Sequence, residues 1–341
     1  MLSGLYFQQV KDAMRKGIVT ISVFVLFLST APPIFAQRPL TIRLGVHGAV
    51  QGAPDVIAIR QGYFKQERLE VDWRRFGVGR EGRDAMIAGA IDINATATTP
   101  FLIGLEKGVP YTAVAVNSLF CGTNHIVVRK DSDIQSIAQL KGKRIALARG
   151  TVTEYIFAAK IAPAYGLKPG DYEVANIADQ KDRIPTLIAK AVDATGIGDP
   201  YVAVAEHEGL VRSLGDFCKY DTLPFLATVT DKVIKENPAA VVAYLRGWLR
   251  AVKLLKEQPE KAAEVYWQEQ EAAGRSVPVS VLDKTLRRMR WETDITPEIE
   301  KYLADQAQDL LKGAGEGRLN SIPDISKALN KELLRKAKAG L

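Results

Sequence analysis

Short apolar runs alternate with segments of helical periodicity in the first third of the chain. The runs at 41–46, 69–73 and 91–97 have the length and composition of buried strands, and each is followed by a turn-rich loop and a helical pattern. This alternation predicts a parallel sheet with helices on its faces. Ligands bind such sheets beyond the carboxyl ends of the strands, so we expect the loops at 47–54 and 77–82 to form a site.

The same pattern begins again further along the chain. Further strands are predicted at 111–116, 125–129, 144–148, 172–177, 194–198 and 223–229, with helices between most of them. From Asp231 onward the spacing is helical, and the tryptophans there (Trp248, Trp267 and Trp291) are predicted to be helical core residues. The sequence therefore predicts two α/β lobes, 37–122 plus 225–341 and 123–224, joined by two crossings of the chain.

Residues 1–36 have the pattern of a secretory signal peptide. Lys11, Arg15 and Lys16 form the positive region, residues 18–28 the apolar core, and Ala36 the small residue at the cut. The core is shorter than the roughly 20 residues of a membrane span. We expect cleavage after Ala36 and an exported protein, with a retained anchor as the alternative; no cysteine lies there to carry a lipid.

The composition and net charge of the chain do not alter the predicted fold. The chain is 47% hydrophobic and 25% charged, as in ordinary globular proteins. Its net charge of +7 includes +2 from residues 1–36, which leaves +5 for the remainder. The basic residues of the last fifteen, such as Lys331 and Arg335, alternate with leucines and predict the solvated face of a terminal helix. No nucleic-acid-binding signature is present, so no nucleic-acid partner is expected.

The loops that start helices suggest an anion site. Helix N-termini present unpaired N–H groups and the positive end of the helix dipole. Threonine hydroxyls at these loops add hydrogen bonds, and Arg80 or Arg83 adds a charged contact. For each threonine alone, capping of its helix is the competing interpretation, and Thr151 or Thr153 followed by Glu154 fits a cap.

The histidines and cysteines of the chain do not form the motif of a metal site or of a catalytic site. No spacing of the three histidines predicts a metal site, and His47 is the one placed at the ligand edge. Cys121 and Cys218 fall at the two predicted crossings, where a disulfide and two buried free thiols are both open. Neither cysteine has an obvious general base nearby in sequence.

Several motifs, in order along the chain, resemble a known family. They are Gly62-Tyr63-Phe64, Gly89-Ala90-Ile91-Asp92-Ile93, Lys107-Gly108-Val109-Pro110, Leu140-Lys141-Gly142-Lys143-Arg144-Ile145-Ala146 with Gly150-Thr151, and Asp199-Pro200-Tyr201. The chain resembles the nitrate/sulfonate/taurine-type periplasmic binding proteins of ABC importers, a family that includes binders of thiamine-pyrimidine precursors. The resemblance covers most of the chain after residue 36.

The resemblance implies a fold, a function and partners. The fold is the two-lobed type II periplasmic-binding-protein fold, in which each lobe is a mixed, mostly parallel sheet flanked by helices. The function is capture of a small anionic organic solute, sulfonate or taurine-like, between lobes that close about a hinge. The permease and the ATPase are expected on separate chains, and the binding protein is expected to be a periplasmic monomer without a cofactor.

Combining the loops with the resemblance, we expect ligand contacts from both lobes. The predicted residues are His47, Gln51, Gly52, Gly79, Arg80, Thr98, Thr99, Asn117, Gly122, Thr151, Val152, Thr153, Asp199 and Tyr201. Asp199 is predicted either to read a ligand amine or to cap its helix.

Ligand identity stays open at this stage. Gly196-Ile197-Gly198 stands where the resemblance leads us to expect bulky aromatics, which predicts a wider pocket. Aromatic sulfonates and carboxylates, nitrate, bicarbonate and a thiamine-pyrimidine precursor are therefore alternatives. A desulfinase with a cysteine nucleophile is known on the same fold, but the loop at 47–54 contains no cysteine. We expect a binding protein and not an enzyme.

Overall fold

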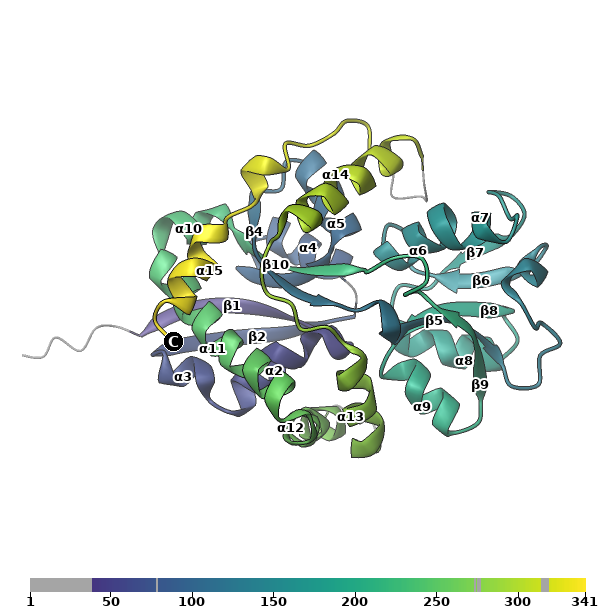
Figure 1. Cartoon of the computed structure of the whole chain (residues 1–341), viewed down its shortest axis with the longest axis horizontal. Helices are drawn as coiled ribbons and strands as arrows, with labels where there is room; N and C mark the ends of the chain where they lie inside the picture. The colour runs from purple at the N-terminus through teal and green to yellow at the C-terminus, as the bar shows by residue number, and fades with distance from the viewer. Residues whose placement is uncertain (1–38, 78, 273, 275–276, 314–318) are drawn as a thin grey trace, which may run out of the picture. The chain divides into compact units, whose positions relative to one another are not determined.

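Two five-stranded sheets organise the structure (Figure 1). The computed structural model describes residues 39–341 except 78, 273, 275–276 and 314–318. The predicted targeting segment, 1–36, lies outside the described residues. The part from Pro39 to Leu341 forms one compact unit.

The first sheet has the strand order β2-β1-β3-β10-β4 and defines the first lobe. Its strands are β1 (Leu40–His47), β2 (Leu69–Phe76), β3 (Ile93–Ala97), β4 (Tyr111–Leu119) and β10 (Pro224–Thr230). β1 pairs in parallel with β2 and β3, while β10 runs antiparallel to β3 and β4. β3 and β4 are buried along their whole length, as expected for strands covered on both faces.

Helices supply the crossovers that parallel pairing requires. In the first lobe they are η1 (Val50–Gly52), α2 (Ala53–Arg60), α3 (Tyr63–Gln66), α4 (Gly79–Ile87) and α5 (Thr98–Glu106). α4 and α5 begin where β2 and β3 end, so their first residues lie at the carboxyl edge of the sheet.

The second sheet has the order β7-β6-β8-β5-β9 and defines the second lobe. Its strands are β5 (Asn124–Arg129), β6 (Arg144–Leu147), β7 (Glu173–Asn176), β8 (Ala194–Gly198) and β9 (Val211–Asp216). Between them lie η2 (Cys121–Thr123), η3 (Ile137–Leu140), α6 (Val152–Ile156), the π-helical η4 (Phe157–Ile161), α7 (Ala162–Ala164), η5 (Gln180–Asp182), α8 (Arg183–Ile188) and α9 (Tyr201–His207). Ser136 and Gln139 form a capping box at the start of η3.

The chain after β10 is helical, as predicted, and packs on the first lobe. Its elements are α10 (Asp231–Glu236), α11 (Pro238–Glu257), α12 (Pro259–Ala272), α13 (Val279–Arg288), α14 (Pro297–Leu311), η6 (Ser326–Ala328) and α15 (Lys331–Lys338). α11 packs against α2, α3 and α15, and α14 packs against α5. Trp248 is fully buried on α11. Trp291 is core but lies after α13, outside any helix, where its indole N–H donates to the Leu286 carbonyl over 3.3 Å.

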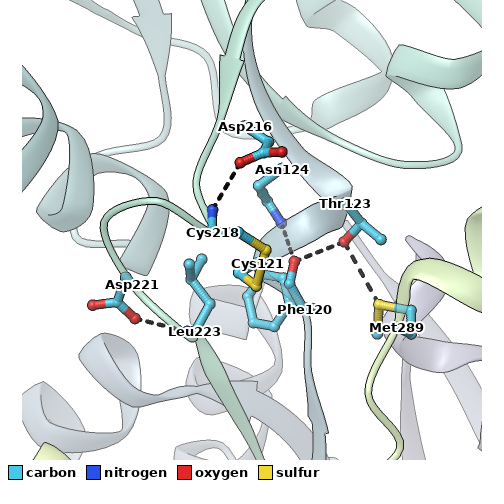
Figure 2. The surroundings of a disulfide bond; sticks show 9 residues. All are labelled: Phe120, Cys121, Thr123, Asn124, Asp216, Cys218, Asp221, Leu223 and Met289. Carbon is cyan, nitrogen blue, oxygen red and sulfur yellow. Dashed lines mark hydrogen bonds between the residues drawn. A yellow bond between two sulfur atoms is a disulfide. The ribbon is translucent and has the colours of Figure 1, made fainter.

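The two lobes are joined by two crossings. Phe120–Thr123 connects β4 to β5, and 217–223 connects β9 back to β10. Cys121 and Cys218 form a disulfide between these crossings, with Cα atoms 4.5 Å apart. Figure 2 shows this disulfide with residues of both crossings, Phe120 and Leu223 among them, around it. The two crossings are therefore covalently tied to each other.

A helix that spans a membrane must be both long and apolar. Within the described ranges, none of the helices has both properties.

Candidate ligand-binding site

A small polar cavity lies where loops of both sheets meet. Measured as space open to the centres of water molecules, its volume is about 40 Å³. A single water needs roughly 10–15 Å³ on this measure, so the cavity has room for a compact group of a few heavy atoms. It is lined by His47, Gln51, Gly79, Ala97, Pro100, Phe120, Asn124, Thr151, Val152, Thr153, Gln180, Arg183 and Phe225.

His47 closes the first-lobe side of the cavity. Its ring packs edge-on against Phe225, with centroids 5.1 Å apart, and its Nδ1 accepts the Ala49 N–H over 3.2 Å. Burial lowers the pKa of His47 to about 4, and the Arg75 guanidinium acts in the same direction. The ring is therefore neutral at physiological pH, and its proton sits on Nε2. The group that His47 offers a ligand is an uncharged Nε2–H donor.

The loop after His47 is fixed by close packing. A Cβ at Gly52 would lie 2.1 Å from the His47 carbonyl oxygen, so a side chain does not fit there. Gly52 thus shapes the loop and does not itself line the cavity. Gln51 lies beside it, 3% exposed, and its Oε1 has no hydrogen-bond partner among the described residues. Gln51 is a buried amide with capacity for a ligand.

Thr151, Val152 and Thr153 bring the start of α6 to the second-lobe side. The Thr151 hydroxyl donates to the Ala148 carbonyl over 2.7 Å and accepts the Glu154 N–H over 3.4 Å. It therefore serves as the N-cap, the role that competed with ligand binding in the sequence. What this loop presents to the cavity, besides side-chain surface, is the backbone of a helix start.

Arg183 is the charged group that lines the cavity, and it is not among the residues predicted from the sequence. It is 2% exposed, and its guanidinium donates to the carbonyls of Ile177, Ala178 and Gly196. Five N–H donors less these three leave two for a ligand. Burial lowers the pKa of Arg183 to about 10, which leaves it charged at neutral pH.

A sequence signal for Arg183 existed. β7 ends at Asn176, and α8 begins at Arg183 after a loop, so the rule applied to the other strand ends also points to 177–183. Gln180 lies in this loop and lines the cavity, and its Oε1 accepts the Gly198 N–H over 2.8 Å.

Six of the fourteen predicted residues line the cavity: His47, Gln51, Gly79, Thr151, Val152 and Thr153. Thr99 lies elsewhere, because its hydroxyl accepts from the Gln306 amide of α14 over 3.1 Å. Thr98, the first residue of α5, and Asn117, in β4, are fully buried and do not line the cavity. Gly122 lies next to the disulfide, and Tyr201 lines a separate cavity with Pro200 and Val204.

The two candidate arginines have other partners. Arg80 donates from the start of α4 to the Arg149 carbonyl of the second lobe over 3.2 Å. Arg83 is buried and binds the carboxylate of Asp84 through Nε and Nη2. The charged side chain that lines the cavity is instead Arg183, on the opposite lobe.

The glycines of β8 do not widen the cavity as predicted. A Cβ at Gly196 would lie 2.5 Å from Leu147 and 3.1 Å from Thr153, so neighbouring side chains already occupy that space. At Gly198 the nearest atoms belong to Gln180 and Asn124, which line the cavity themselves.

Asp199 does not line the cavity but lies buried at a contact between the lobes. Its Oδ1 accepts the Ala203 N–H over 3.1 Å, and Arg288 of α13 lies 4.0 Å from Oδ2. Its carbonyl accepts the Val50 N–H of the first lobe over 3.3 Å, and the Asp199–Pro200 bond is cis. Burial raises the pKa of Asp199 to about 7, against the opposing effects of Arg288, the Ala203 N–H and the Thr285 hydroxyl.

We therefore expect Asp199→Asn to flatten the pH dependence of stability. Between its unfolded pKa near 3.8 and its folded pKa near 7, the native state binds the extra proton, so wild-type stability falls as pH rises through this window. Relative to the wild type, the free energy of unfolding of the variant should rise between pH 4 and 7, by at most about 4 kcal/mol. Above pH 7 the difference between the two proteins should stay constant. Urea unfolding at pH 4, 5.5, 7 and 8 measures this, and a difference that is the same at all four values contradicts it.

This arrangement defines a class of protein. Two mixed sheets joined by two crossings, with the cavity at loops of both, form the type II periplasmic-binding-protein fold. The model of the NMT1/THI5 like family matches residues 50–262, more than half of the 341 residues. The chain belongs to this family.

Individual relatives agree with this assignment. A Bacillus subtilis (strain 168) protein with a provisional name as an aliphatic sulfonates-binding protein is 25% identical over 264 residues, which cover 74% of this chain and 78% of the relative. The taurine-binding periplasmic protein of Escherichia coli (strain K12) is 24% identical over 262 residues, 73% of this chain and 79% of the relative. These relatives are named as binding proteins, not as enzymes.

A solved structure shows the same fold. The alkanesulfonate-binding protein SsuA from Xanthomonas axonopodis pv. citri, bound to MOPS, aligns with a TM-score of 0.75 at 21% sequence identity. The alignment covers 86% of this chain and 99% of that chain.

Proposed function

We propose that this protein is the periplasmic solute-binding component of an ABC importer and that it captures a small sulfonate-type anion in the cavity between its lobes. Closure of the lobes about the two crossings would hold the solute, and the closed form would be recognised by a permease on a separate chain. The names of the relatives support this role, and the geometry of the cavity supports an anionic ligand.

The observation that carries the proposal is the buried Arg183. Its three protein acceptors are neutral carbonyls, and the Asp179 carboxylate acts on it without a salt bridge between the two among the described residues. A buried charge without a counter-ion in direct contact is costly, and a bound anion would supply one. Arginine also suits sulfonate and carboxylate oxygens, because two parallel N–H groups can bind two oxygens.

Contacts from both lobes support a closure mechanism. His47, Gln51 and Gly79 belong to the first lobe, whereas Thr151, Gln180 and Arg183 belong to the second. A ligand that touches both groups would bind the closed form better than the open one, and this difference in affinity is what moves the equilibrium. We take the lobes to be 37–122 plus 225–341 and 123–224, with 1–36 as a cleaved signal peptide and a monomeric mature protein.

The cysteines of this chain do not support a function as a thiol-dependent enzyme. Its two cysteines are both in the disulfide, so neither is a free nucleophile.

Thermal unfolding of the protein from residue 37 onward, against a panel of anions, tests the proposal. The panel contains short alkanesulfonates, taurine, nitrate, bicarbonate, an aromatic carboxylate and a thiamine pyrimidine. A ligand of the native state at a hundredfold excess over its Kd adds roughly 2.7 kcal/mol, which is about 5–10 °C in Tm. We expect this shift with alkanesulfonates; no shift with any anion would refute the proposed function.

Hydrogen bonds between the lobes predict a second effect. Tyr155 of α6 donates to Asp309 of α14 over 2.9 Å, and Tyr155 is 1% exposed. If ligand binding requires closure, Tyr155→Phe should weaken ligand affinity about ten- to 150-fold, since a hydrogen bond to a charged group contributes about 1.5–3 kcal/mol. Isothermal titration measures the change. Tyr244→Phe is the matched control, because its hydroxyl donates to Asp55 over 2.9 Å within the first lobe, and equal losses in both variants would contradict the prediction.

A further inference from the structure

The charged side chain that lines the cavity is a cation. Arg183 is the cation that lines it, His47 contributes a neutral N–H donor, and Gln51, Asn124 and Gln180 contribute neutral amides. No aspartate or glutamate of the described residues is among the lining side chains. A solute bound here therefore touches a positively charged side chain and no negatively charged one, while the Asp179 carboxylate acts on His47 and Arg183 from outside the lining.

The nearest acidic side chains are held elsewhere. Asp179 accepts the Lys181 N–H over 3.0 Å and pairs with Lys181 Nζ at 3.1 Å. Glu154 accepts the Gly150 N–H and faces a different cavity, which it lines with Phe157 and Tyr172. Asp199, as described above, faces Ala203 and Arg288. Each would need to leave its partners to reach a ligand.

The remaining lining is apolar. Ala97, Pro100, Phe120, Val152 and Phe225 provide hydrocarbon surface beside the polar groups. Such a surface favours a short alkyl chain and disfavours an ammonium group, because a charged amine buried without a partner carries a large desolvation cost.

We propose that this site selects short-chain organic anions and rejects solutes that carry an ammonium group within two carbons of the anionic group, taurine included. The inference rests on the proposed function and deepens it by naming the substrate class. Arg183 binds the oxyanion, the apolar wall takes the alkyl chain, and the absence of a carboxylate from the described lining excludes the zwitterion.

Propane-1-sulfonate and taurine form the pair that tests this. They have the same chain length, with a methyl group in one where the other has an ammonium. Titration calorimetry of the protein from residue 37 onward, in a buffer free of sulfonates, should give propane-1-sulfonate at least a tenfold lower Kd. Equal affinities, or tighter taurine binding, would overturn the inference while leaving the proposed function intact.

A lining variant tests the cause of the selectivity. Gln180→Glu places a carboxylate in the cavity and keeps the acceptor for the Gly198 N–H, so the local fold is preserved. It should weaken propane-1-sulfonate binding at least tenfold and reduce the preference over taurine. Gln268→Glu on α12 changes the net charge equally at an exposed position that does not line the cavity, and should leave the ratio unchanged.

The remaining outcomes are decisive as well. An unchanged ratio in Gln180→Glu would overturn the inference, since lining charge would then not set selectivity. Binding of nitrate with neither sulfonate bound would also overturn it, because the apolar wall would have no role. Failure of every anion in the panel to bind would instead refute the proposed function itself.

Discussion

Replacement of Cys121 and Cys218 by serine should lower the free energy of unfolding by about 2–5 kcal/mol. The disulfide joins residues 97 positions apart, and a cross-link that closes a loop of this length removes much conformational freedom from the unfolded chain. Urea unfolding of the oxidised wild type and of the double variant measures the difference.

Reduction provides the control for this experiment. Dithiothreitol should shift the wild-type midpoint toward that of the double variant and should leave the variant unchanged. Ligand affinity of the variant should change far less than its stability, since neither cysteine lines the cavity. Equal midpoints for oxidised and reduced wild type would contradict the stabilising role of the disulfide.

Arg183→Met should weaken binding of the anionic ligand about a hundredfold, which corresponds to roughly 2.7 kcal/mol. Methionine is an unbranched side chain of similar length, but it lacks the positive charge and all the N–H donors of Arg183. The thermal shift seen with alkanesulfonates should then disappear at ligand concentrations that saturate the wild type. If Arg183→Met shows the same ligand-induced thermal shift as the wild type, Arg183 does not bind the anion.

Loss of the carbonyl contacts of Arg183 requires its own control. Arg212 also donates to two carbonyls of the second lobe, those of Ser132 and Ile134, but does not line the cavity. Arg212→Met should therefore lower stability and retain ligand binding. Arg183→Lys keeps a charge without the planar fork and should bind with intermediate affinity.

The fold was predictable from the sequence because buried strands leave a local pattern. β1, β3 and β8 are short apolar runs followed by turns, and the structure confirms all three. β9 was not predicted, because Val211–Asp216 is polar and only partly buried in most positions. Its pairing with β5 depends on contacts far apart in the sequence, which no local pattern records.

The site was predictable only in part. Loops at strand ends led to His47, Gln51 and the start of α6, since topology alone places such loops together. Thr99 is predicted as a ligand residue because its hydroxyl lies at a helix start after a strand, but Gln306, 207 residues away, donates to that hydroxyl. Arg183 is not among the predicted residues, because its burial follows from tertiary packing, which no local sequence pattern records.

The short distance between the two crossings has a consequence for engineering. The second lobe leaves the host chain and returns to it at points whose Cα atoms lie 4.5 Å apart, and a covalent bond fixes that spacing. The second lobe is therefore inserted into the first with its two ends close together. This arrangement tolerates domain grafting and circular permutation. The second lobe of a relative with the same crossing geometry should be transferable as a cassette, which would exchange one wall of the ligand site while the other is retained.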